Sequence, residues 1–169
     1  MSTTSGETAT ITLPAIQQIL VTRRFRATPA RVFRVWSDPE SIAQWWSGQR
    51  DAGTRTSVEN DFRIGGRWRY VITSDDGGEV AFHGEYRDIV DGRKIVYTEV
   101  YEMPGAATGD DSGAPLVTVT MEPDGDGTLL TLLIETVDKA LRDMIMDSGM
   151  ESGMHGQMEI IDELSGALA

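Results

Sequence analysis

Most of the chain alternates between apolar and polar residues with the period of a β-strand. In residues 17–27, Ile19, Val21, Arg23 and Phe25 fall on one side, which is the pattern of a half-buried strand. The same alternation predicts further strands at residues 54–62, 67–73, 80–90, 94–103, 116–122 and 128–136. Turns rich in aspartate and glycine, such as residues 75–78, separate several of these segments and predict antiparallel hairpins.

Two short helices are predicted directly after the first strand. Thr28-Pro29 and Asp38-Pro39 each place a capping residue before a proline at the first helical position. The apolar residues that follow recur with helical spacing. We therefore expect helices over residues 29–36 and 39–45, and a loop over residues 104–115, where glycine, proline and aspartate dominate.

The last part of the chain changes to a helical period. Residues on one helical face are Met146, Met150, Met154, Met158, Ile161 and Ser165. This spacing predicts one long amphipathic helix, with Asp147 or Ser148 as its candidate cap. Gly149, Gly153 and Gly156 each lower its intrinsic propensity by ~1 kcal/mol relative to alanine. Packing against the rest of the protein must therefore hold this helix.

The order of these elements predicts an α+β fold. A curved antiparallel sheet of six to seven strands has a concave face that must be covered. The C-terminal helix is the one predicted element long enough to cover it, and two short helices follow the first strand. Because a single helix cannot fill the hollow, we expect an apolar cavity beneath it. Residues 16–169 are assigned to this single domain and residues 1–15 to a disordered N-terminal tail.

Composition narrows the range of functions. The 169 residues include 15 lysines and arginines and 27 aspartates and glutamates, for a net charge of -12. This balance argues against binding to nucleic acid or to an anionic membrane surface, because both require a basic footprint. The chain has no cysteine, which excludes disulfides and thiolate metal sites. No apolar run reaches the ~18 residues of a membrane helix, and we expect a cytoplasmic protein.

Several short motifs occur in a characteristic order. They are residues 27–33 (ATPARVF), 36–40 (WSDPE), 44–46 (QWW), 61–68 (DFRIGGRW), 82–86 (FHGEY), 93–98 (RKIVYT) and 149–154 (GMESGM). As an ordered set they resemble domains of the activator of heat-shock protein 90 ATPase homologue family. The resemblance covers roughly residues 19–168. It implies the helix-grip fold of the START-like, polyketide-cyclase and birch-pollen-allergen (SRPBCC) superfamily, in which a sheet grips the last helix around an apolar cavity.

Aromatic and methionine side chains are the candidate lining of that cavity. The aromatic candidates are Trp45, Phe62, Trp68, Tyr70, Phe82, Tyr86 and Tyr97. Met150, Met154 and Met158 are the candidates from the C-terminal helix, since thioethers adapt to ligands of varied shape. Each of these residues has an alternative role as plain core. Trp45 and Trp46 are neighbours on one short helix, so we expect one in the core and the other at the mouth of the pocket.

Glu99 is the candidate polar anchor. It shares a strand side with Ile95 and Tyr97, so an inward phase would place a carboxylate in apolar surroundings and raise its pKa. Glu99 would then be a ligand anchor or a general acid or base. With the opposite phase it would simply be solvated, and the sequence leaves both readings open.

Other catalytic and metal chemistry has weak support. His83 and Glu85 fall on one side of a strand and are compatible with a metal or acid–base pair, but we favour a solvated cross-strand pair. His155 is expected at the edge of the methionine face. Asp61 is expected to cap a turn. No nucleophile elbow or phosphate loop occurs. We therefore predict no catalytic residue, metal or cofactor.

These observations favour binding of a small hydrophobic molecule between the sheet and the C-terminal helix. Glu99, Tyr97 and Thr98 would orient it. One alternative, implied by the resemblance, is a co-chaperone-like interaction that stimulates the ATPase of heat-shock protein 90. Another is a cyclase- or hydratase-type enzyme on the same fold. The edge strands of such a sheet also leave homodimerisation open.

Overall fold

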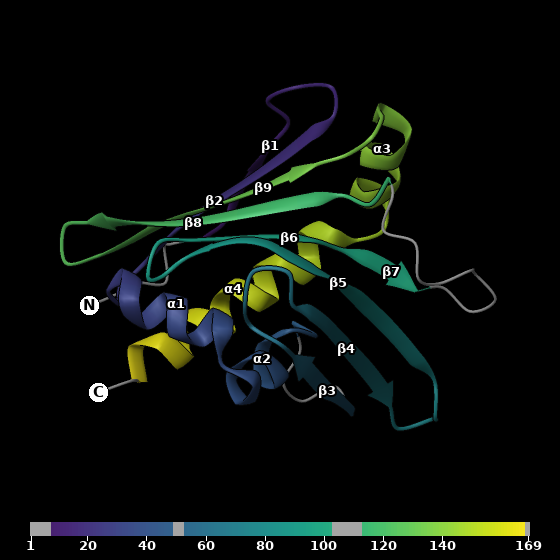
Figure 1. The fold of residues 1–169 in the computed structure, drawn as a ribbon, viewed down its shortest axis with the longest axis horizontal. Coiled ribbons are helices and arrows are strands. Elements are labelled where there is room, and N and C mark those ends of the chain that lie inside the picture. Colours follow the sequence, from purple (N-terminus) through teal and green to yellow (C-terminus); the bar gives the residue numbers. More distant parts are fainter. Residues whose placement is uncertain (1–7, 49–52, 103–112, 168–169) are drawn as a thin grey trace.

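A curved antiparallel sheet surrounds the last helix in the computed structural model, which describes residues 8–48, 53–102 and 113–167 (Figure 1). The strands are β1 (Thr10–Thr12), β2 (Gln18–Phe25), β3 (Thr54–Asn60), β4 (Arg67–Ser74), β5 (Glu79–Val90), β6 (Lys94–Thr98), β7 (Val100–Glu102), β8 (Leu116–Asp124) and β9 (Gly127–Glu135). The helices are α1 (Pro29–Ser37), α2 (Pro39–Trp45), α3 (Lys139–Asp147) and α4 (Met150–Ala167).

The sheet has the order β1-β2-β9-β8-β6-β5-β4-β3, and β7 pairs with β5. All pairings between these strands are antiparallel. Helix α4 runs across the hollow of the sheet, with α1 and α2 beside it (Figure 1). The predicted α+β helix-grip fold is confirmed, although the sheet has nine strands among the described residues and not six to seven.

The first additional strand lies in the segment that we expected to be a disordered tail. Thr10–Thr12 pairs with β2, with Ile11 opposite Val21. Ala9 is buried, and Ile11 packs against the core. Backbone pairing with an edge strand orders a short segment that has no strong pattern of its own.

The second additional strand arises because residues 94–103 do not form one strand. Strand β6 pairs with β5 and β8, whereas β7 pairs with β5. The break falls at Glu99, whose backbone N–H donates to the Pro115 carbonyl. The expected loop that follows lies mostly outside the described residues, which omit 103–112.

The predicted long C-terminal helix is also interrupted. Helix α3 ends at Asp147, with Ser148 as its C-cap, and α4 begins at Met150. Gly149 between them has φ of 88°, a left-handed conformation that glycine adopts without steric cost. Met146 therefore belongs to α3. The methionine spacing continues through this break, whereas Ser148, a candidate cap for the start of the long helix, is the C-cap of α3.

Close packing holds the glycine-rich helix α4, as its composition requires. Met158 and Ile161 are fully buried members of the core, and α4 contacts α1 and α2. A Cβ atom on Gly156 would lie 2.3 Å from the Gly48 carbonyl oxygen, so glycine permits α4 to contact the chain just after α2. At the other end of α4, Asp162 pairs with Arg23 and Arg26. Among the described residues, no helix has the length and apolar character needed to cross a membrane.

Candidate functional site

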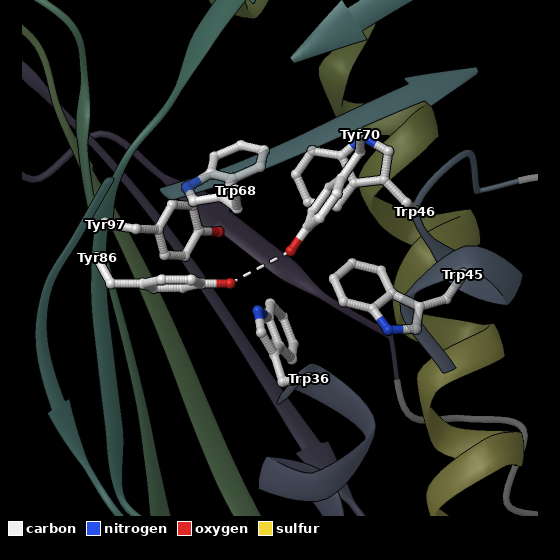
Figure 2. A pocket seen from close by; sticks show the side chains of 7 residues that line it. All are labelled: Trp36, Trp45, Trp46, Trp68, Tyr70, Tyr86 and Tyr97. Carbon is white, nitrogen blue, oxygen red and sulfur yellow. Dashed lines mark hydrogen bonds between the residues drawn. The ribbon is translucent and has the colours of Figure 1, made fainter. Parts of the chain in front are cut away.

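Seven aromatic side chains surround a small void between the sheet and the helices (Figure 2). We call this group the aromatic chamber; its members are Trp36 from α1, Trp45 and Trp46 from the end of α2, Trp68 and Tyr70 from β4, Tyr86 from β5, and Tyr97 from β6. The void measures about 10 Å³, which is room for about one water molecule. The expected ligand-sized cavity is therefore not open in this structure, because the rings themselves fill the hollow.

Ring-to-ring packing explains how the hollow is filled. Trp46 contacts Trp68, Tyr70 and Phe82 with centroid distances of 5.6, 4.8 and 5.6 Å. Trp68 contacts Tyr70 at 4.6 Å and Tyr97 at 5.6 Å. Most of these pairs have the edge-to-face geometry that aromatic rings prefer.

Trp45 and Trp46 are both buried, with exposed fractions of 1% and 8%, so the expectation that only one could be buried is wrong. Trp45 packs on Trp36, and its indole N–H donates to the Val35 carbonyl at 3.0 Å. Trp46 turns instead toward the sheet. The curved sheet and α1 enclose the end of α2 from two sides, so both indoles find apolar surroundings. Within the described residues, no hydrogen bond holds the Trp46 indole.

Tyrosine hydroxyls provide polar groups inside the chamber. The hydroxyls of Tyr70 and Tyr86 lie 3.3 Å apart (Figure 2), and Tyr86 donates to Asn60 Oδ1 at 2.6 Å. Burial raises the pKa of Tyr86 to about 12 and raises the pKa of Tyr70 and of Tyr97 further above the ordinary value of 10.0. All three hydroxyls are therefore neutral at physiological pH and can donate or accept hydrogen bonds.

Glu99 lies on the inner side of the sheet, beside the chamber. Tyr97 precedes it by two residues and lines the void; Tyr101 follows it by two residues and stacks on Phe82 at 5.2 Å. The Glu99 carboxylate also acts electrostatically on Tyr70 and Tyr97. Burial raises the pKa of Glu99 from 4.5 to about 7. Within the described residues, its carboxylate makes no hydrogen bond or ion pair.

The remaining predicted residues lie around the chamber and do not line its void. Phe82 packs between Trp46 and the half-exposed Tyr101 at the rim. Phe62 packs on Phe33 and Tyr86 behind the chamber. Of the methionines, Met158 is fully buried, and Met150 and Met154 are partly buried against the core.

The sequence analysis missed two contributors to the chamber. Trp36 lines the void although it was assigned only to the apolar side of the first helix. Asn60 anchors the Tyr86 hydroxyl and donates to the Ser37 carbonyl at 3.1 Å. The helical spacing of residues 29–36 identified Trp36 as inward-facing, but no local pattern distinguished the chamber from other core.

His83 belongs to a different cluster on the outer side of the sheet. Its Nδ1 lies 2.7 Å from Glu102 Oε2, and Arg69 binds the same carboxylate through two nitrogens at 3.0 Å each. Arg69 and His83 together lower the pKa of Glu102. Glu85 pairs with Arg87, and His83 is buried, so the expectation of a solvated histidine is wrong.

His155 and Asp61 take simpler roles. His155 lies on α4 and is 40% exposed, with its Nε2 4.0 Å from Glu151. Asp61 accepts hydrogen bonds from Arg63 in the turn before β4. Over residues 8–48, 53–102 and 113–167, no group of three or more His, Asp or Glu side chains is arranged to hold a metal ion.

Solved structures share this architecture. A protein from Rhodobacter sphaeroides is 22% identical, with 95% of this chain and 99% of that chain covered and a TM-score of 0.83. A protein from Mycobacterium smegmatis is 19% identical, with 94% and 98% covered and a TM-score of 0.80. A protein from Chromobacterium violaceum is 26% identical, with 87% and 96% covered and a TM-score of 0.71. No curated protein matches the chain.

The family comparison covers most of the domain. The family model described as "Activator of Hsp90 ATPase homolog 1-like protein" matches residues 26–166. This range begins just after β2 and ends within α4, so it includes every residue of the aromatic chamber. The chain therefore belongs to the Activator of Hsp90 ATPase homolog 1-like family.

Proposed function

We propose that the protein binds a small hydrophobic molecule, with an aromatic ring, in the aromatic chamber. The observation that carries this proposal is the gathering of neutral hydroxyls inside a closed group of rings, with a carboxylate beside it that acts on two of those hydroxyls. Burying such polar groups is unfavourable unless they are satisfied, and aliphatic side chains would fill the same hollow without that cost. The Glu99 carboxylate has no protein partner within the described residues, which favours a role in holding a ligand.

Ligand entry requires one side chain to leave, because the void holds about one water molecule. Trp46 is the candidate. It is the most exposed of the seven chamber residues at 8%, and within the described residues its indole has no hydrogen bond to break. Its neighbours Trp68, Tyr70 and Phe82 contact it through ring faces and edges. A ligand ring of similar size can replace those contacts.

The energy of this exchange limits the affinity of a plain hydrocarbon. A bicyclic ring that buries roughly 200 Å² gains about 5 kcal/mol at 25 cal/mol per Å². Displacing Trp46 exposes a comparable apolar area and therefore costs a similar amount of free energy. The net affinity then depends on polar contacts, and the Tyr70 and Tyr97 hydroxyls and Glu99 are the groups in place to make them.

Titration of indole into ¹⁵N-labelled protein tests the proposal, because each of the four tryptophans gives its own indole N–H signal. We expect saturable shifts at Trp46 and Trp68 and little change at Trp45, whose N–H is bonded to Val35. Trp46→Ala opens the chamber and should bind indole about tenfold more tightly, since no ring has to be displaced. The surface variant Val90→Ala is the matched control. Absence of saturable shifts in both the wild type and Trp46→Ala would refute ligand binding here.

A second candidate is a co-chaperone-like interaction, and the closed chamber favours it because a filled interior leaves the outer surface as the place of action. The net charge of -12 makes such an interaction sensitive to salt. Stimulation of an Hsp90 ATPase at low salt, lost at high salt, would support this alternative. An ATPase rate that is independent of added protein at both salt concentrations would exclude it.

A further inference from the structure

We propose that the ligand of the aromatic chamber is an organic cation: an aromatic molecule with a protonated amine that takes the place of the Trp46 ring, pairs with Glu99 and lies against the rings of Trp68 and Tyr70. This inference rests on the proposed binding function and adds the chemical class of the ligand.

The first support is the isolation of the Glu99 carboxylate. The strand positions on either side of it, Tyr97 and Tyr101, carry inward-facing rings. The Glu99 carboxylate acts on two titratable groups of the packed elements, Tyr70 of β4 and Tyr97 of β6, while burial raises its own pKa. Both tyrosines are neutral at physiological pH. Glu99 is partly buried, and a partly dehydrated carboxylate with no cation beside it is unfavourable, so a ligand ammonium would supply the missing charge.

The second support is the set of rings that stay in place when Trp46 is displaced. Trp68 contacts Tyr70 at 4.6 Å and Tyr97 at 5.6 Å, and the Glu99 carboxylate acts electrostatically on both tyrosines. Tryptophan and tyrosine faces attract cations through the negative charge of their ring faces, and grouped aromatic rings are a recurring way to recognise ammonium groups. Rings of this kind together with one partly buried carboxylate match an ammonium better than a neutral or an anionic head group.

The third support is the field of the whole protein. Its net charge of -12 concentrates cations near the surface and repels anions. Tyr101 is 49% exposed and stacks on Phe82, so an exposed ring lies two residues from Glu99 on the side from which a ligand would approach. Anionic hydrophobes such as fatty acids would meet an unpaired carboxylate of the same sign along this route.

Three ligands with one ring system and different charges test the inference. Tryptamine is a cation, tryptophol (2-(indol-3-yl)ethanol) is neutral, and indole-3-acetate is an anion at pH 8. The affinities are measured by calorimetric titration at pH 8 in 0.15 M salt. At this ionic strength, charges more than ~8 Å apart are largely screened, so a difference in affinity reports the local contact between the ligand and Glu99. We expect tryptamine to bind at least tenfold more tightly than tryptophol, and indole-3-acetate to bind most weakly.

Two charge-matched variants assign the preference to one residue. Glu99→Gln should remove the advantage of tryptamine while tryptophol still binds. Glu122→Gln, at an exposed position of β8, changes the net charge by the same amount and should keep the preference. Equal affinities for tryptamine and tryptophol, or a preference that survives Glu99→Gln, would overturn the inference and leave ligand binding intact. If none of the three compounds binds to wild type or to Trp46→Ala, both the inference and the proposed function are refuted.

Discussion

The inner face of the sheet has two halves with different chemistry. Strands β2, β8 and β9 contribute aliphatic side chains that are completely buried, among them Ile19, Val21, Val119, Met121 and Leu130. Strands β4, β5 and β6 contribute the tryptophan and tyrosines of the chamber with their hydroxyls, and the Glu99 carboxylate lies beside them at the break between β6 and β7. Both halves cover the same layer of helices (Figure 1).

Under the proposed function, the aliphatic half serves stability and the aromatic half serves recognition. Aliphatic side chains gain free energy from burial and leave no polar group to satisfy. The aromatic half also carries polar groups, whose burial costs free energy unless they are satisfied. Groups that lower stability locally are typical of binding sites. Substitutions in the two halves should therefore change the stability of the protein in different directions.

The largest effect is expected in the aliphatic half. Leu130→Ala should lower the free energy of unfolding by about 3 kcal/mol, because the residue has no exposed surface and its neighbours cannot fill the space. Chemical denaturation at pH 7 measures this change. The indole shifts at Trp46 should persist in this variant under native conditions. A loss below about 1 kcal/mol would contradict the assignment of this half to stability.

The next largest effect is expected from substitution of Glu99. In contrast to Leu130→Ala, this substitution should raise the free energy of unfolding. The carboxyl has a pKa of about 7 in the folded protein and 4.5 ordinarily, so between these values the folded state binds more protons than the unfolded state. Stability from this group therefore falls as the pH rises from 4.5 to above 7. Glu99→Gln should be more stable than the wild type by about 2 kcal/mol at pH 8 and nearly equal to it at pH 4.5.

Denaturation curves at both pH values test this prediction. Glu122→Gln, which removes an exposed carboxylate, should show no such pH-dependent gain. Equal stability of Glu99→Gln and wild type at pH 8 would show that the Glu99 charge is not destabilising.

A pair of glycine variants tests how α4 is held next to the chamber. Gly156→Ala places a Cβ 2.3 Å from the Gly48 carbonyl and should lower the stability by about 2 kcal/mol through overpacking. In Gly153→Ala the added Cβ has no atom within 4 Å, and the variant should raise the stability by about 0.5 kcal/mol because alanine has the higher helix propensity. Thermal unfolding of both variants measures the contrast. Equal effects would mean that α4 and the end of α2 are not in firm contact.

The smallest expected effect is the pH dependence of cation binding. Tryptamine affinity should rise about tenfold between pH 6 and pH 8, because Glu99, with a pKa of about 7, loses its proton over that range. The amine stays protonated, and Tyr70 and Tyr97 stay neutral. Tryptophol affinity should be nearly constant. A flat tryptamine profile would separate cation recognition from the ionisation of Glu99.

Local patterns predicted most elements because each carries its own signal. The strand of residues 17–27 corresponds to β2 (Gln18–Phe25), and Asp38 caps α2 as its position before proline indicated. The errors fall where contacts distant in sequence decide the outcome. Strand β1 forms by pairing with β2, and the separation of α3 from α4 occurs within an uninterrupted methionine pattern.

The candidate site shows the same contrast between residues that local patterns predict and residues whose positions depend on contacts distant in sequence. Strand alternation placed Trp68, Tyr70 and Tyr97 on inward positions, and all three line the chamber. Alternation could not give the phase of Glu99, because one residue at a strand break has no pattern of its own. Nor could it show that Trp45 and Trp46 would both be buried, since that depends on α1 and the sheet closing around the end of α2.

The amino-acid sequence by itself determined the α+β class, the order of the elements and the family, because periodicity, caps and turn residues act over a few neighbouring positions. Only the tertiary structure decided that the expected cavity is closed by its own rings and that Glu99 faces those rings. Both outcomes depend on how side chains from five separate elements share one volume, and no local pattern encodes the space that remains when they meet.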